Sequence, residues 1–119
     1  MITVTLPWPD KALSPNGKHG AWQVKWRAKK AARNNALVLA RQQRKELPKT
    51  GLLKVSIVAL PPDRRRRDRD NLLAMLKPSL DGIAQALDVD DSRFVPFPIE
   101  IREPEPGGQI DITVEPLND

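Results

Sequence analysis

The pattern of hydrophobic and polar residues predicts four β-strands. Hydrophobic residues alternate with threonines over Ile2–Leu6, which is typical of a strand with one buried face. The segment Leu52–Leu60 is rich in Leu, Val and Ile, and it predicts a central strand that is buried on much of both faces. Two more alternating segments, Phe94–Ile101 and Ile110–Val114, are joined by a short Pro- and Gly-rich turn and predict a hairpin.

Two prolines predict where the strand over 94–101 lies in the sheet. Pro96 and Pro98 are two residues apart, so both missing N–H donors fall on the same edge of the strand. That edge cannot be paired along its length. We therefore expect this strand at the margin of the sheet, or with that edge unpaired.

The two longest segments between the predicted strands have the composition and spacing of helices. Ala21–Lys45 consists mostly of strong helix formers and contains no Pro or Gly. Its predicted apolar stripe comprises Ala21, Val24, Ala28, Ala32, Ala36 and Leu39. The second helix, Asn71–Leu87, has a buried stripe of Leu72, Leu76, Leu80, Ile83 and Leu87. Because proline lacks an N–H donor, Pro78 predicts a kink there, or a helix whose regular part begins near Lys77.

These elements follow one another in the order β-α-β-α-β-β. The order predicts an α+β fold in which a four-stranded mixed sheet packs against two helices. The length of 119 residues predicts a single domain that spans residues 1–119. Trp22 and Trp26 share a face near the start of the first helix, and packing into the core or a dimer interface is favoured over stacking on exposed bases.

Composition excludes several classes of protein. The chain has no cysteine, which excludes a disulfide framework and a Cys-based zinc site. No apolar run approaches the roughly 20 residues of a membrane span, and Met1–Leu6 lacks the pattern of a signal peptide. We therefore expect a soluble cytoplasmic protein that has no membrane partner. A single histidine, His19, argues against a His-rich metal site, and the absence of a G-x-x-x-x-G-K-[ST] loop argues against a nucleotide cofactor.

Charge is distributed unevenly along the chain. The net charge is +5, yet residues 18–49 hold ten Lys or Arg and one acid, whereas residues 99–119 hold six acids and one base. One region would attract a polyanion and another would repel it. This asymmetry favours a nucleic-acid partner, with Lys25, Lys29 and Arg33 of the first helix as candidate phosphate ligands. The alternative is a solvated basic helix.

The segment "PPDRRRRDRDN", residues 61–71, combines five arginines with three aspartates. The candidate phosphate ligands in it are Arg64, Arg65, Arg66, Arg67 and Arg69, since guanidinium groups can hold phosphates bidentately. In an extended chain, Asp68 and Asp70 would point to the same side. A second acidic group, which includes Asp90 and Asp91, follows the second predicted helix.

Clustered carboxylates suit a hard cation such as Mg²⁺, which could activate water for attack on a phosphodiester. Two structural alternatives remain open. Asp68 and Asp70 could cap the second helix, and the residues from Asp88 to Asp91 could form a solvated turn.

Five short motifs resemble the RusA family of Holliday-junction endonucleases. They are "LPWP" (6–9), "PNG" (15–17), "PDRRRRDRDN" (62–71), "LDG" (80–82) and "DDSRF" (90–94). The resemblance covers most of the chain, and its specific part is the D-x-D-N motif followed at this separation by D-D.

The resemblance implies a RusA-like fold and a homodimer that nicks four-way DNA junctions symmetrically with Mg²⁺ or Mn²⁺. It implies that Asp68, Asp70 and Asp91 are metal ligands and catalytic residues, and that Asp90 is a less certain ligand. The family's lysine falls four residues after the second Asp of D-x-D, where this chain has Ala74, and a lysine follows three residues later as Lys77. Lys77 is therefore the candidate for stabilising charge at the scissile phosphate.

The sequence thus predicts a metal-dependent crossover junction endonuclease for DNA recombination and repair, of a type common in bacterial and prophage genomes. The alternative from another class is a non-catalytic, structure-selective DNA-binding protein.

Overall fold

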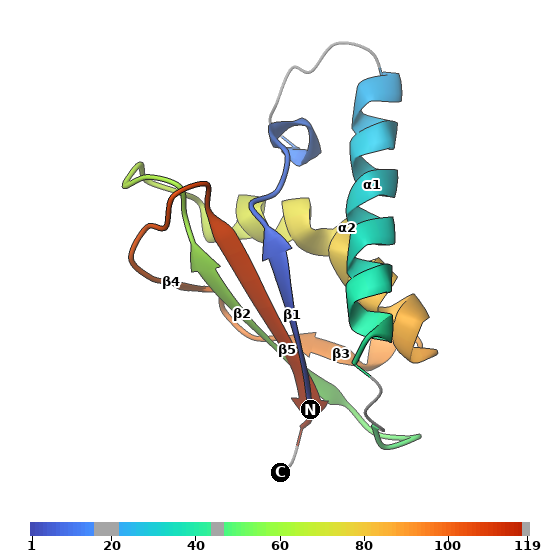
Figure 1. The fold of residues 1–119 in the computed structure, drawn as a ribbon. Helices are drawn as coiled ribbons and strands as arrows, with labels where there is room; N and C mark the ends of the chain where they lie inside the picture. Colours follow the sequence, from blue (N-terminus) through green and yellow to red (C-terminus); the bar gives the residue numbers. More distant parts are fainter. Residues whose placement is uncertain (16–21, 44–46, 118–119) are drawn as a thin grey trace.

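The computed structural model describes residues 1–15, 22–43 and 47–117 (Figure 1). The expectations for His19, for most of the "PNG" motif and for the two ends of the first helix, Ala21 and Lys45, lie outside these residues. None of the helices within the described ranges is both long enough and apolar enough to cross a membrane.

A mixed five-stranded sheet forms one layer of the molecule. Its strands are β1 (Ile2–Pro7), β2 (Leu53–Leu60), β3 (Phe94–Pro96), β4 (Glu100–Ile101) and β5 (Gln109–Pro116). The order across the sheet is β1-β5-β2-β3, and β4 also pairs with β2. β5 runs antiparallel to both of its neighbours, whereas β3 and β4 run parallel to β2. The α+β class and the mixed sheet are therefore confirmed, and β2 is the central strand.

The predicted hairpin of the last two strands is wrong. β3 and β4 pair with one side of β2, and β5 pairs with the other side. The connection between them crosses the end of β2, where Glu105 N donates to Pro61 O at 2.9 Å. Gly107 and Gly108 make this crossing possible because both have positive φ values, 80° and 77°.

The strand predicted over 94–101 is divided in two, which raises the number of strands from four to five. Phe97 N donates to Val55 O at 2.9 Å. Pro96 and Pro98 flank it and have no N–H, so their side of the strand forms the sheet margin. The marginal position is confirmed. In the central strand β2, buried residues alternate with partly buried ones, so one face is buried as predicted and the other face is buried only in part.

Two helices cover one face of the sheet (Figure 1). They are α1 (Trp22–Arg41) and α2 (Arg69–Leu87). The inward strand residues Ile2, Val4, Val55, Ile57 and Ile112 form one core with Leu72, Leu76 and Ile83 of α2 and with Ala36 and Ala40 of α1. The predicted stripe of α2 is buried as far as Ile83, and Leu87 is partly buried. Because α2 is continuous through Pro78, a regular helix beginning near Lys77 is excluded.

The predicted stripe of α1 is buried only in the second half of the helix. Of its members, Ala36 is fully buried and Leu39 is partly buried, but Val24 is 47% exposed. Figure 1 shows the reason: the first turns of α1 extend past the end of β1, so no strand lies beneath them. The N-terminal half of α1 is therefore a surface element with a large exposed area.

The backbones of the two helices come close together at Gly82. A side chain at this position would collide with the backbone carbonyl oxygen of Arg33 on α1. Glycine therefore sets the separation of the helices at the point where Arg33 faces α2.

Candidate functional site

In the loop between β2 and α2, most of the charged side chains pair with other groups of the same chain. Asp63 Oδ2 accepts a bond from Arg65 Nε at 3.1 Å, and Asp63 Oδ1 lies 2.9 Å from an Arg67 nitrogen. The hydrogen bonds from Arg65, assisted by Arg67, hold the pKa of Asp63 well below its usual range. Asp63 thus offsets the repulsion between Arg65 and Arg67.

Arg67 braces this loop against the body of the protein. Its side chain is only 16% exposed, and it donates to the carbonyl oxygens of Asp63 (2.9 Å) and Arg65 (2.6 Å). Its guanidinium also lies 5.2 Å from the ring centroid of Trp8. The donors of Arg67 are therefore engaged inside the protein.

The other arginines of the segment differ in how many contacts their guanidinium groups make within the protein. Arg64 pairs with Glu103 at 2.7 Å, and Arg69 Nε donates to Ile99 O at 2.9 Å. Arg65 pairs with Asp63, but its side chain is 82% exposed. Arg66 is exposed and has no hydrogen bond or ion pair with any other residue that the structure describes. Arg66 is thus the most accessible of the five for a phosphate.

Asp68 caps α2. Its Oδ1 accepts bonds from the backbone N–H groups of Asp70 (2.8 Å) and Asn71 (3.2 Å), which satisfies donors that a helix start leaves unpaired. Asp70 lies in the first turn of the helix, so the expectation of an extended Asp68–Asp70 segment is wrong. The alternative that this acidic group caps the helix is confirmed, and both residues remain exposed.

The second acidic group follows the end of α2. Asp88 closes the helix in the left-handed conformation, with φ at 55°. The short 3-10 helix η2 (Asp91–Arg93) comes next, and Asp90 Oδ1 accepts from Ser92 N at 2.9 Å. This backbone hydrogen bond lowers the pKa of Asp90. Asp91 occupies the first position of η2 and is exposed.

Helix α2 separates the two acidic groups. At a rise of 1.5 Å per residue, Asp70 and Leu87 are about 25 Å apart along the axis. In the described parts of the chain, no group of three or more His, Cys, Asp or Glu side chains could hold a metal ion. The structure therefore does not bring Asp68, Asp70 and Asp91 of one chain together.

One face of α2 links these acidic groups. Asp70, Ala74, Lys77 and Asp81 follow at steps of four, three and four residues, which places all four on the same side of the helix. Ala74, where the resemblance to the RusA family predicts a lysine, and Lys77 thus face the same way, about one turn apart.

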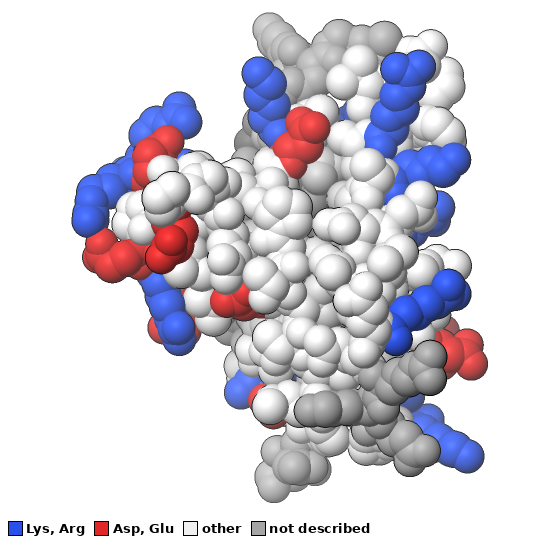
Figure 2. Space-filling model, viewed as in Figure 1, with Lys and Arg blue, Asp and Glu red and all other residues white. Residues whose placement is uncertain are grey.

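A groove runs between this face and α1. It has a volume of about 520 Å³ and is lined by Trp26, Lys29, Lys30, Arg33, Ala74, Lys77, Pro78 and Asp81. We call it the helix groove. Figure 2 shows Lys and Arg side chains projecting along α1, whereas acids and bases are interspersed around the loop after β2. Four cations and one carboxylate therefore converge on the groove.

A second hollow continues the groove toward η2. It has a volume of about 450 Å³, shares Arg33 and Asp81 with the helix groove, and also includes Asp90 and Asp91. We call it the acidic hollow. Asp81 and Lys30 were not among the predicted site residues. The four-residue spacing from Lys77 to Asp81 is the signal that could have identified Asp81.

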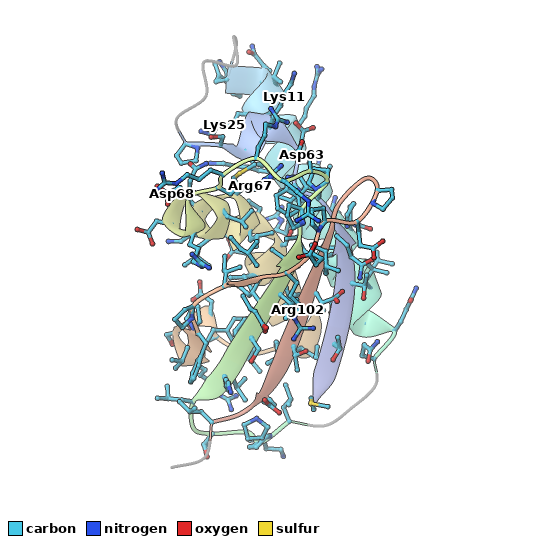
Figure 3. The ribbon with its side chains drawn as sticks, turned by 90° about the vertical axis from the view of Figure 1, so that its left-hand side faces the viewer. Lys11, Lys25, Asp63, Arg67, Asp68 and Arg102 are labelled. Atoms are coloured by element: carbon cyan, nitrogen blue, oxygen red, sulfur yellow. The ribbon has the colours of Figure 1, made fainter. Side chains whose placement is uncertain are left out.

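The candidate phosphate ligands of α1, which are Lys25, Lys29 and Arg33, do not all lie on one surface. Lys29 and Arg33 line the helix groove, whereas Lys25 Nζ donates to Ser14 O at 3.5 Å. Figure 3 shows Lys25 and Lys11 on the side of the molecule where Asp68 and Arg67 lie. Lys11 belongs to the 3-10 helix η1 (Lys11–Leu13).

Lys11 also lines a third hollow, of about 400 Å³, together with Arg65, Arg66, Arg67 and Asp68. Basic residues thus line two separate hollows, the helix groove and this third hollow.

Both tryptophans of α1 face solvent. Trp22 is 72% exposed and Trp26 is 53% exposed. Packing into the core is therefore wrong for both residues, whereas a dimer interface and base stacking stay as predictions.

Comparison with known proteins gives one informative relative. No protein-family model matches the chain. An uncharacterized protein of Xylella fastidiosa (strain Temecula1) is 44% identical over 117 residues, which cover 96% of this chain and 76% of that protein. Identity of this extent over nearly the whole chain shows common descent. The protein described here therefore belongs to the same family as this Xylella protein.

Proposed function

We propose that the protein is a metal-dependent endonuclease that resolves four-way DNA junctions, with Mg²⁺ as its cofactor and Mn²⁺ as a substitute. The observation that supports this proposal best is the continuity of the helix groove with the acidic hollow. Cations that can hold a phosphodiester adjoin carboxylates that suit a hard metal ion. A nuclease that uses a metal requires both groups at one place.

Each group has a chemical role in this proposal. Lys29, Lys30 and Arg33 would hold the phosphates of the bound strand. A Mg²⁺ ion on the carboxylates would supply Lewis acidity and an activated water. Lys77 lines the groove and would stabilise the negative charge that develops at the scissile phosphate.

A dimer resolves the separation of the two acidic groups. Asp68 and Asp70 lie at one end of α2, and Asp91 lies at the other. A two-fold axis across the middle of α2 would bring the first group of one subunit to Asp91 of the partner subunit. It would create two equal metal sites, which is the number that symmetric cleavage of two strands requires.

Mixing two inactive variants tests this arrangement. We expect Asp70→Asn and Asp91→Asn each to lower cleavage of a synthetic four-way junction at least about 100-fold, since even outer partners of metal ligands are worth about 10–100-fold. Dimers that contain one copy of each variant would have one site with both mutations and one intact site. Co-refolding the two variants should therefore restore nicking of one strand, without the paired cuts of the wild-type protein.

Two results would contradict the proposal. If Asp70→Asn cuts the junction at a rate near that of the wild-type protein, Asp70 is not a ligand. If the mixture stays inactive while mixed dimers form, the site is not shared between subunits. Glu105→Gln is the matched control, because Glu105 is an exposed carboxylate on the loop before β5, and it should leave cleavage unchanged.

A non-catalytic, structure-selective DNA-binding protein is the second candidate. Two observations favour it. The described residues of one chain form no three-ligand metal group, and Ala74 stands where the resemblance to the RusA family predicts a lysine. Tight binding of four-way DNA with no cleavage in Mg²⁺ or Mn²⁺ would select this function.

A further inference from the structure

Trp26 is an exposed aromatic residue in a groove that four cations and one carboxylate line. Its side chain is 53% exposed, and it lines the helix groove beside Lys29, Lys30 and Arg33. Trp22, one turn earlier, is more exposed but does not line the groove. A large apolar ring on the surface gains little burial energy, so its place among phosphate-binding cations points to a ligand that has both an aromatic face and negative charge.

We propose that the helix groove binds an unpaired segment of nucleic acid, with one base stacked on Trp26. This inference deepens the proposed function and rests on it, because unpaired bases become accessible where a DNA duplex branches or is distorted. The phosphates on either side of the base would contact Lys29, Lys30, Arg33 and Lys77. Stacking on an aromatic ring combined with a basic track is the general mode of single-strand binding.

Before a strand binds, the ammonium group of Lys30 lies over the ring of Trp26. The Lys30 Nζ lies 5.1 Å from the centroid of the Trp26 ring. A cation–π contact at an exposed site is weak, so a base can displace the ammonium group from the ring. Lys30 then turns to the adjacent phosphate and stays paired with a negative charge. The exchange replaces one weak contact with a stacked base and a charge-assisted bond.

The acidic end of the groove limits which part of the strand fits. Asp81 lines both the groove and the acidic hollow, and Asp90 and Asp91 line the acidic hollow with it. In the absence of a metal ion these carboxylates repel phosphates, so the strand is confined to the cationic part near Trp26. A paired base cannot lie flat on the ring without leaving its own stack. The groove therefore selects unpaired bases over intact duplex.

Replacing each tryptophan in turn tests this proposal. The probe is a labelled oligo-dT of about 20 nucleotides, measured by fluorescence anisotropy in EDTA so that no cleavage occurs. Trp26→Ala should weaken its binding about tenfold, a loss that corresponds to one stacked base, whereas Trp22→Ala should leave it unchanged. Binding of a blunt duplex of the same length should be the same for both variants and the wild-type protein.

Intrinsic fluorescence gives a second measurement. Oligo-dT should quench tryptophan emission in the wild-type protein and in Trp22→Phe, and the quenching should disappear in Trp26→Phe. The proposal is wrong if the Trp26 and Trp22 variants lose affinity equally, or if Trp26→Ala weakens duplex binding as much as oligo-dT binding. Because these measurements need no metal, they separate failure of the stacking site from failure of the nuclease function.

Discussion

Arg66 and Arg67 are adjacent in the sequence and have opposite surroundings. Arg66 is exposed to solvent, whereas Arg67 is bonded to two carbonyl oxygens, to Asp63 and to the face of Trp8. The number of charges in the segment therefore overstates the number of groups that can bind a phosphate. Each arginine has to be judged by the contacts that it already makes.

This contrast predicts that one of two similar substitutions lowers stability and that the other lowers DNA binding. Arg67→Ala should lower the free energy of unfolding by about 1–3 kcal/mol, because it removes charge-assisted hydrogen bonds from a largely buried side chain. Arg66→Ala should leave stability within about 0.5 kcal/mol and should weaken DNA binding. Urea unfolding and anisotropy titrations on the two variants measure both quantities. Equal stability of the two variants would contradict the bracing role of Arg67.

At the scale of elements, the crossing of α1 and α2 positions the groove. Gly82 lets α2 approach the backbone of α1 at Arg33. Arg33 in turn belongs to both the helix groove and the acidic hollow. A residue without a side chain therefore fixes the separation between the cations of one helix and the carboxylates of the other.

Gly82→Ala tests this role because two effects of the substitution have opposite signs. Alanine is favoured over glycine inside a helix by about 1 kcal/mol, so at an open position the substitution would stabilise α2. At Gly82 the new methyl group meets backbone, and we expect a net loss of about 1–3 kcal/mol. Thermal unfolding measures the sign. Gln85→Ala, at an exposed position of α2, is the control and should not destabilise the protein.

The elements differ in how well the sequence predicts them. The stripe of α2 is predicted correctly from Leu72 to Ile83 because these residues share one buried core with the strands. The stripe of α1 is predicted too long, because periodicity does not reveal where the sheet ends beneath a helix. The hairpin is mispredicted because a short Pro- and Gly-rich connection fits a tight turn as well as it fits a crossing over β2. Pairing partners depend on tertiary packing, which local patterns do not encode.

At the scale of the whole molecule, the helices and the open face of the sheet carry different charge. The cations of α1 lie beside α2, on the side of the sheet that the helices cover. The outward side of β5 carries Asp111 and Glu115, and Lys54 on β2 lies 4.5 Å from the ring centroid of Phe97. Under the proposed function, DNA should therefore approach the molecule from the side of the helices.

Salt dependence measures that direction of approach. Each phosphate contact contributes about −0.9 to the slope of log affinity against log salt concentration. Replacing both Lys29 and Arg33 with alanine should reduce the magnitude of the slope for four-way DNA by about 2. Lys54→Ala, on the other face of the sheet, should leave the slope unchanged. A slope that responds to Lys54 but not to the groove variants would place the DNA on the opposite face.

The candidate site was predicted only in part, for a geometric reason. The sequence identifies the types of residue, the two acidic groups and the basic helix. The order of the elements places the second helix between the two acidic groups, but it does not reveal whether the chain folds back to bring them together, or that Asp81 shares a hollow with Asp91. Both depend on the direction in which the chain runs before and after the helix, and the number of residues between two motifs does not give that direction.

The placement of Lys77 has a consequence for how such a site can change over time. Inserting three residues into a helix rotates the residues beyond the insertion by about 300°, close to a full turn, and advances them by about 4.5 Å. A lysine shifted in this way still points into the same groove, nearer to one set of carboxylates and farther from the other. Insertions of three or four residues in α2 can therefore alter the reach of the cation while preserving its orientation, whereas insertions of one or two residues would turn it away from the groove.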